Sequence, residues 1–257
     1  MLGLLAITAH ELGHYEAMRR CSIRIKEVSL LGLPVPFLPS IHYTRKETVW
    51  GVHLFVIGAY VEAYSADEIK SKRLWDQLYV SGSGPIANIV YALALVAIAE
   101  CVASFQTGQI EKAGIGLLVF GSAAGVVWLA RRYIALVLPV LTIPILALIG
   151  YIIFGVNPIT AVEGGSGGPI AVIANLTGAG TVVDALLLAA SLSISLGIIN
   201  LAPLPPFDGG RIFGAILKTW FGERFENAYN GVTIPFFVLL VVYFLGLDAI
   251  RIWKWVW

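Results

Sequence analysis

Several stretches of this chain are long enough and apolar enough to cross a lipid bilayer as helices. Such a helix needs about 18–20 mostly apolar residues, and 58% of the 257 residues are hydrophobic. Only 13% are Asp, Glu, Lys or Arg, against about 25% in soluble domains. The sequence therefore predicts an all-α polytopic membrane protein, and the net charge of +1 gives no sign of nucleic-acid binding. We expect six spans, at 1–19, 82–104, 114–130, 133–155, 184–204 and 232–250.

The basic residues predict the orientation of these spans. Fourteen of the seventeen Lys and Arg residues follow the first, third and fifth spans, and Lys112, Arg251 and Lys254 are the other three. Because cytosolic loops are enriched in Lys and Arg, we expect a multi-pass protein of the cell membrane with the fourteen at the cytosolic face. Six alternating spans then leave both termini outside.

Two connections are more than simple loops. The stretch SIRIKEVSLL at 22–31 alternates imperfectly, as a strand does, and VWGVHLFVIGAYVEAY at 49–64 is rich in β-branched and aromatic residues. The second stretch is too apolar for a free loop and too broken by glycine for a span. We expect it to form a small membrane-associated β-hairpin, because polar backbone at membrane depth must be covered by protein. The Gly-rich stretch 156–181 lacks Lys and Arg, which indicates an external loop with a re-entrant turn.

A polar motif, HELGH at 10–14, interrupts the first apolar stretch. Residues four apart lie on one face of a helix, so His10 and His14 can present two imidazoles to one zinc ion. Glu11 lies about 100° round the helix, within reach of a metal-bound water. The alternative is a pair of histidines hydrogen-bonded in a helix interface. Polar residues inside a membrane are costly and usually functional, which favours the metal.

A catalytic zinc ion usually takes three protein ligands, so a third is needed. His53, in the expected hairpin, is one candidate. Asp208 is another, in NLAPLPPFDGGRI at 200–212, where three prolines break the helix and two glycines allow a tight turn behind the carboxylate. Unwound backbone at this depth is tolerated where it lines a protein cavity or water. The residues alone leave open whether Asp208 binds metal or is a solvated helix cap.

HELGH together with NLAPLPPFDGG resembles the site-2 protease family, the intramembrane zinc metalloproteases of peptidase family M50. The segments RRCSIRIKEVSL, IGAYVEAY, GSGPIANIVYAL and GGSGGPIAVIANLTGAG are similar to those of the bacterial members that cleave anti-sigma factors. The likeness covers about 1–100 and 160–250. Bacterial members often carry PDZ domains where this chain has two extra spans, at about 114–155.

This resemblance implies Zn²⁺ on His10, His14 and Asp208, with Glu11 as the general base. It also implies that Asn200, and with it Asn88, lies near the scissile peptide. The whole chain, 1–257, would be one membrane metalloprotease domain with its core at 1–104 and 160–250. Its substrate would be a transmembrane protein, such as an anti-sigma factor or another single-span protein, cleaved nearer the cytosolic face of the bilayer.

Two other functions remain open at this level. A non-proteolytic zinc-binding membrane protein, a chaperone or a metal-handling carrier, would keep the fold but would not need Glu11. Another class of membrane HExxH protein takes its third ligand from a Glu on a downstream soluble-side helix. This chain has no ExxxD in a matching helix and has Asp208 followed by Gly209 instead.

Overall fold

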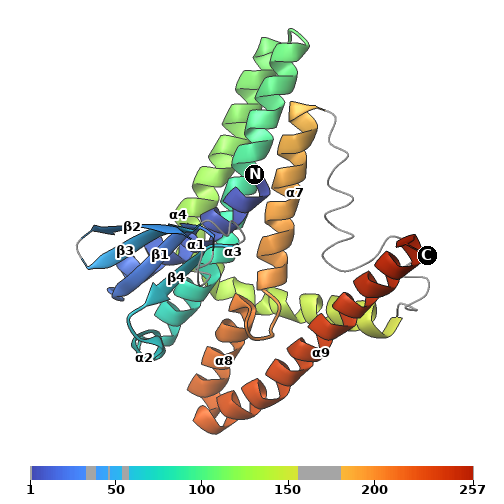
Figure 1. Ribbon diagram of the computed structural model, residues 1–257. Coiled ribbons are helices and arrows are strands. Elements are labelled where there is room, and N and C mark those ends of the chain that lie inside the picture. The colour runs from blue at the N-terminus through green and yellow to red at the C-terminus, as the bar shows by residue number, and fades with distance from the viewer. Residues whose placement is uncertain (1, 33–38, 46, 54–57, 156–180, 257) are drawn as a thin grey trace.

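The computed structural model describes residues 2–32, 39–45, 47–53, 58–155 and 181–256. Helices dominate the fold, and one small sheet lies beside the first helix (Figure 1). The helices are α1 (Leu2–Arg20), α2 (Ala66–Lys70), α3 (Leu74–Gln106), α4 (Ile110–Gly155), α7 (Val182–Asn200), α8 (Asp208–Phe221) and α9 (Glu223–Val256). The strands are β1 (Ile25–Leu31), β2 (Ser40–Arg45), β3 (Thr48–His53) and β4 (Tyr60–Ala63).

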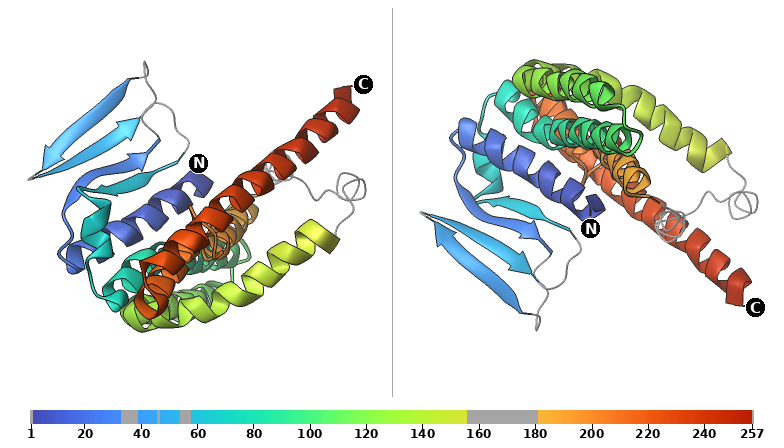
Figure 2. Two further views of the ribbon diagram at one scale, coloured as in Figure 1. Left: turned by 90° about the horizontal axis from the view of Figure 1, so that it is seen from below. Right: turned by 90° about the horizontal axis from the view of Figure 1, so that it is seen from above.

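The central helix is α3, which packs against α1, α4, α7 and α8. Every residue from Leu78 to Asn88 is buried. This stretch contains Gly82 and Gly84, and small residues let membrane helices approach closely. The core around it combines residues of α1, β1, α3, α4 and α8. Figure 2 shows α1 between the sheet and the other helices, so α1 joins the two parts of the fold.

Four helices are long and apolar enough to cross a membrane, among the residues that the structure describes. They are Leu74–Gln106, Glu111–Ala135, Val182–Asn200 and Glu223–Lys254. These helices overlap the spans predicted at 82–104, 114–130, 184–204 and 232–250, although α7 ends at Asn200. The stretch 1–19 is helical, as α1, but is not among the four. Two glutamates and the terminal arginines fall within this 19-residue helix and make it less apolar than the others.

The arginine pair at 131–132 does not interrupt its helix. We expected a turn there between two spans, but α4 runs unbroken from Ile110 to Gly155. Arg131 is only 4% exposed, and it donates to the Tyr79 hydroxyl at 3.1 Å and pairs with Glu16 at 3.0 Å. The two halves of α4 run in different directions (Figure 1), but the helix does not end between them as the predicted turn required. Partners on α1 and α3 satisfy the charge of Arg131 within the helix packing.

The sheet corrects the hairpin predicted at 49–64. Its strand order is β2-β3-β1-β4, with β1 parallel to β3 and antiparallel to β4. The two strands of the expected hairpin, β3 and β4, therefore lie on opposite sides of β1. The strand predicted at 22–31 is present as β1, and it takes the central place because its buried Ile25 and Val28 belong to the same core as α1. The segments 54–57 and 156–180 lie outside the described residues.

The predicted break before Asp208 is present. Helix α7 ends at Asn200, residues 201–207 form a non-helical turn, and α8 begins at Asp208. The three prolines of this turn have no backbone N–H to continue a helix. A Cβ at Gly209 would lie 2.5 Å from the carbonyl oxygen of Ala202, so only glycine permits this close return. The turn brings the Asp208 carboxylate back into the helix packing.

Candidate metal centre

His10, His14 and Asp208 meet between α1 and the start of α8. Nε2 of His10 lies 3.0 Å from Oδ2 of Asp208, and Nε2 of His14 lies 3.2 Å from the same oxygen. The two Nε2 atoms are 3.1 Å apart. Each of the three residues is 5% exposed. The side chains proposed as ligands from the sequence therefore converge, and the alternative of Asp208 as a solvated cap is wrong.

The surroundings of His14 suit a cation between these groups. Its Nδ1 lies 2.7 Å from the carbonyl oxygen of Val80, and this nitrogen carries the proton because a carbonyl oxygen only accepts. In the neutral ring the Nε2 lone pair then faces a carboxylate oxygen of Asp208, which is also an acceptor. A metal ion would satisfy both atoms. Ligand atoms of a tetrahedral zinc with bonds of ~2.0–2.1 Å lie about 3.3 Å apart, close to the spacing of this cluster.

Gly84 of α3 leaves the room that such an ion needs. A Cβ at this position would lie 2.6 Å from Nε2 of His10 and closer still to Nε2 of His14. Sequence reasoning did not single out Gly84, although its segment, GSGPIAN, contributes to the family resemblance. Nothing in the local pattern shows that Gly84 faces the histidines, because this depends on how α3 is rotated against α1.

Glu11 lies beside this cluster without being bonded to it. The residue is half-buried, and no hydrogen bond or ion pair joins it to the described residues. Its carboxylate still interacts electrostatically with His10, His14, Asp208 and Arg211. Its carboxylate is therefore free to accept a proton beside the three converging side chains.

The two asparagines named by the resemblance occupy different places. The amide of Asn200, the last residue of α7, donates to the carbonyl oxygen of Leu196 at 3.1 Å. Its role near a scissile peptide remains a prediction. Asn88 is completely buried and lies 3.3 Å from His10 Nδ1. It therefore contacts the metal centre rather than an exposed surface.

His53, the other candidate for the third ligand, lies elsewhere. Its Nδ1 is 2.8 Å from Oγ of Ser40 across the sheet, and its Nε2 is 3.9 Å from Glu27. Within the described part of the chain, the group that could hold a metal ion comprises His10, His14 and Asp208. Asp208 rather than His53 therefore lies with the two histidines.

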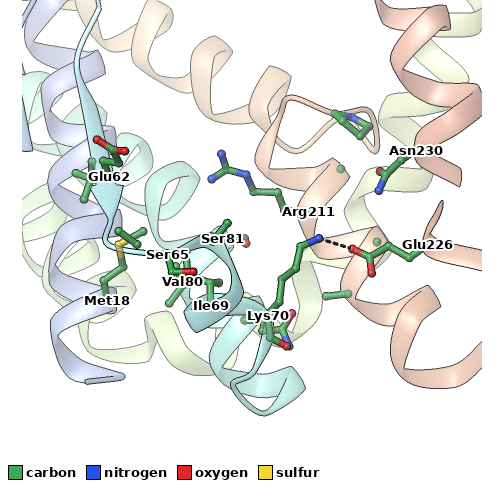
Figure 3. Close-up of a pocket in the computed structure, with 18 of the residues that line it drawn as sticks. Met18, Glu62, Ser65, Ile69, Lys70, Val80, Ser81, Arg211, Glu226 and Asn230 are labelled. Carbon is green, nitrogen blue, oxygen red and sulfur yellow. Dashed lines mark hydrogen bonds and ion pairs between the residues drawn. The ribbon is translucent and has the colours of Figure 1, made fainter. Parts of the chain in front are cut away.

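A pocket of about 470 Å³ opens next to this centre, lined by β4, α1, α2, α3, α8 and α9 (Figure 3). Arg211, three residues after Asp208, extends into the pocket and lies 3.8 Å from that carboxylate. Lys70 and Glu226 pair across it at 3.4 Å. Strand β4 is at the edge of the sheet, and its residues 61–63 line the pocket. Among the described residues, an unpaired strand edge thus runs beside the metal centre.

Comparison with known proteins agrees with this site. A stretch of 84 residues is 39% identical to a Helicobacter pylori (strain J99 / ATCC 700824) protein named "Putative zinc metalloprotease". That stretch covers 31% of this chain and 23% of the relative's length. The model of peptidase family M50 matches residues 1–244, a range that includes Glu11 and the three converging side chains. The chain belongs to peptidase family M50.

Proposed function

We propose that this protein is an intramembrane zinc metalloprotease of the site-2 type, which hydrolyses peptide bonds within or near transmembrane segments of membrane proteins. Membership of family M50 makes it a peptidase with Zn²⁺ as its cofactor. The more specific proposal, an intramembrane protease of the site-2 type, rests on one observation. Two imidazoles and a carboxylate converge in buried positions, with an unbonded glutamate alongside, in a chain with four apolar helices long enough to cross a membrane.

Each residue of the centre has a separate task in this proposal. His10, His14 and Asp208 hold the zinc ion, which when bound polarises the scissile carbonyl and acidifies a water molecule. Glu11 takes a proton from that water and passes it to the leaving amine. Asn200 exchanges its local bond to Leu196 for one to the substrate backbone or to the oxyanion.

The free edge of β4 suits an extended substrate segment. The Tyr64 amide donates to the carbonyl oxygen of Arg24, towards β1, at 3.1 Å. Backbone amides alternate between the two edges of a strand, so the N–H of Ala63, which also lines the pocket, points away from β1. A helical substrate hides its peptide bonds and must unwind first. Strand addition then holds it through main-chain hydrogen bonds, which tolerate many sequences. The proposed substrate-binding strand is therefore β4, the second of the two strands in the segment 49–64.

The substrate in this proposal is a single-span protein, such as an anti-sigma factor, embedded in the same bilayer.

The chain acts as one domain, with the metal centre nearer the cytosolic face and both termini outside. The described basic residues support this orientation. Arg132 of α4 lies 3.8 Å from Asp76 at the start of α3, and Arg131 reaches Glu16 near the end of α1. Basic residues near the end of α1 and in the middle of α4 therefore lie close to the start of α3, on one side of the bundle.

The competing function is that of a membrane zinc-binding protein without protease activity. The two are separated by expressing the protein with a panel of single-span substrates and comparing wild type with Glu11→Gln. The amide cannot accept the proton of water, so cleavage should fall ~10²–10⁴-fold while zinc content stays unchanged. Glu100→Gln, the same change at an exposed glutamate of α3, is the matched control and should cleave normally. Cleavage by Glu11→Gln at the wild-type rate would contradict the proposed mechanism.

A further inference from the structure

Asn88 is a buried amide near the middle of α3. It is 0% exposed. Burying an amide in apolar surroundings is unfavourable unless its hydrogen bonds are made, and polar residues inside a membrane usually have a function. The proposed mechanism assigns no task to Asn88, so its contacts need an explanation of their own.

Three groups surround the amide of Asn88. One end lies 2.8 Å from the carbonyl oxygen of Ala6 on α1, and the other end lies 3.2 Å from the backbone nitrogen of Gly197 on α7. The second end also lies 3.3 Å from Nδ1 of His10. A carbonyl oxygen only accepts and a backbone nitrogen only donates. The NH₂ group therefore faces Ala6, and the amide oxygen faces both Gly197 and His10.

We infer that Asn88 is a positioning residue of the metal centre: its amide oxygen accepts a hydrogen bond from Nδ1–H of His10 and so directs the Nε2 lone pair of His10 towards Asp208 and His14. A histidine binds metal through the nitrogen that lacks a proton, and the hydrogen bond of its other nitrogen fixes which one that is. The inference rests on the proposed function only in taking this cluster as the zinc site.

One face of α3 then orients both histidines. The Val80 carbonyl oxygen accepts a hydrogen bond from Nδ1–H of His14 at 2.7 Å, and the Asn88 amide oxygen does the same for His10. Val80, Gly84 and Asn88 are four residues apart and so lie on one side of the helix. Gly84, between the two acceptors, leaves space for the Nε2 atoms. α3 thus provides no zinc ligand itself but holds both ligands of α1 in the tautomer that can bind metal.

The first test measures the zinc dissociation constant of the purified full-length protein by competition with a chelator. Asn88→Leu removes the acceptor at similar volume, and loss of such a partner typically weakens metal binding about 10–100-fold. Asn88→Asp keeps an oxygen for His10 and should lose much less. Ser193→Ala is the matched control. It removes a buried hydrogen bond of 2.9 Å to the Asn88 backbone but leaves His10 untouched, so its zinc affinity should equal that of wild type.

The second test uses only the wild-type protein and so does not depend on whether a variant folds. Nitrogen-15 NMR of the histidine side chains in the zinc-loaded wild type should show His10 protonated at Nδ1 and bound through Nε2. Binding of His10 through Nδ1, or wild-type zinc affinity in Asn88→Leu, would overturn the inference. If Asn88→Leu does not fold, the NMR result decides alone. Neither readout involves cleavage, so a protein that binds zinc in this way but cleaves nothing would contradict the proposed protease and leave the role of Asn88 intact.

Discussion

At the scale of single residues, the metal centre depends on close approaches between three helices. The ligand atoms lie within 3.0–3.2 Å of one another, and the surface behind them is formed by a glycine of α3. A single added carbon atom can therefore disturb the site, whereas many exposed changes leave it intact.

Gly84→Ala should abolish zinc binding without unfolding the protein. The new Cβ would lie 2.6 Å from Nε2 of His10, which forces the imidazole away from the ligand position. Zinc content of the purified protein, measured by atomic absorption, checks this. Gly125→Ala in α4 is the control, since nothing lies within 4 Å of a Cβ at that position. A Gly84→Ala protein with one zinc ion per chain would show that the metal does not lie between these groups.

Asp208→Ala should lose most of its zinc, because two histidines alone cannot complete the usual set of three protein ligands. The matched control is Asp184→Ala. This carboxylate closes the capping box at the start of α7 with Thr181, and losing a cap typically costs about 1 kcal/mol of stability without changing zinc content. Unchanged zinc in Asp208→Ala would remove this carboxylate from the ligands.

At the scale of elements, the order of the strands decides where a substrate can bind. β1 pairs on both sides, with β3 and β4, so its edges are occupied. β2 and β4 are the outer strands, but every residue of β2 is exposed, whereas β4 lines the pocket beside Arg211. A substrate strand added to β4 would lie next to the metal centre, and one added to β2 would not.

Ala63→Pro should strongly reduce cleavage of transmembrane substrates while zinc content stays unchanged. Proline removes the N–H of this residue, which points away from β1 to the free edge of β4, and the neighbouring Tyr64 amide keeps its bond to Arg24. Ala63→Val retains the donor and favours a strand, so it should cleave nearly as well as wild type. The cleaved fraction of a single-span reporter substrate measures both variants. Normal cleavage by the proline variant would show that substrate is held elsewhere.

At the scale of the whole molecule, basic residues of several helices are concentrated on one side of the bundle. The basic residues near the end of α1, at the start of α3 and in the middle of α4 lie together, linked through Glu16 and Asp76. The turn between α3 and α4, with Lys112 just after it, lies at the other end of the 33-residue α3. A membrane around this bundle would therefore have one strongly basic side.

A reporter that is active only in the cytosol should be active when fused after Arg132 and inactive when inserted at Gly108 or fused after Trp257. A reporter that is active only outside the cell should give the reverse result at each position. This pattern follows from the enrichment of Lys and Arg in cytosolic segments. The opposite result at all three positions would invert the bundle and place the metal centre nearer the outer face.

The sequence by itself indicated the chemistry of this protein, because that information is local. Four-residue spacing puts His10 and His14 on one helical face whatever surrounds them, and the prolines before Asp208 break the helix wherever it lies. Long apolar stretches likewise predict membrane helices by composition alone. These features could be read in windows of a few to about twenty residues.

Tertiary structure decided which of these local features meet. The partners of the buried Arg131 in α4 are Glu16 and Tyr79, which lie more than fifty residues away in the sequence. β1 lies between β3 and β4 and packs against α1. The alternation of residues within a strand does not show which other strands pair with it. The same holds for Gly84 and Asn88. Their positions behind the histidines are set by the rotation of α3 against α1, which only the contacts between distant segments determine.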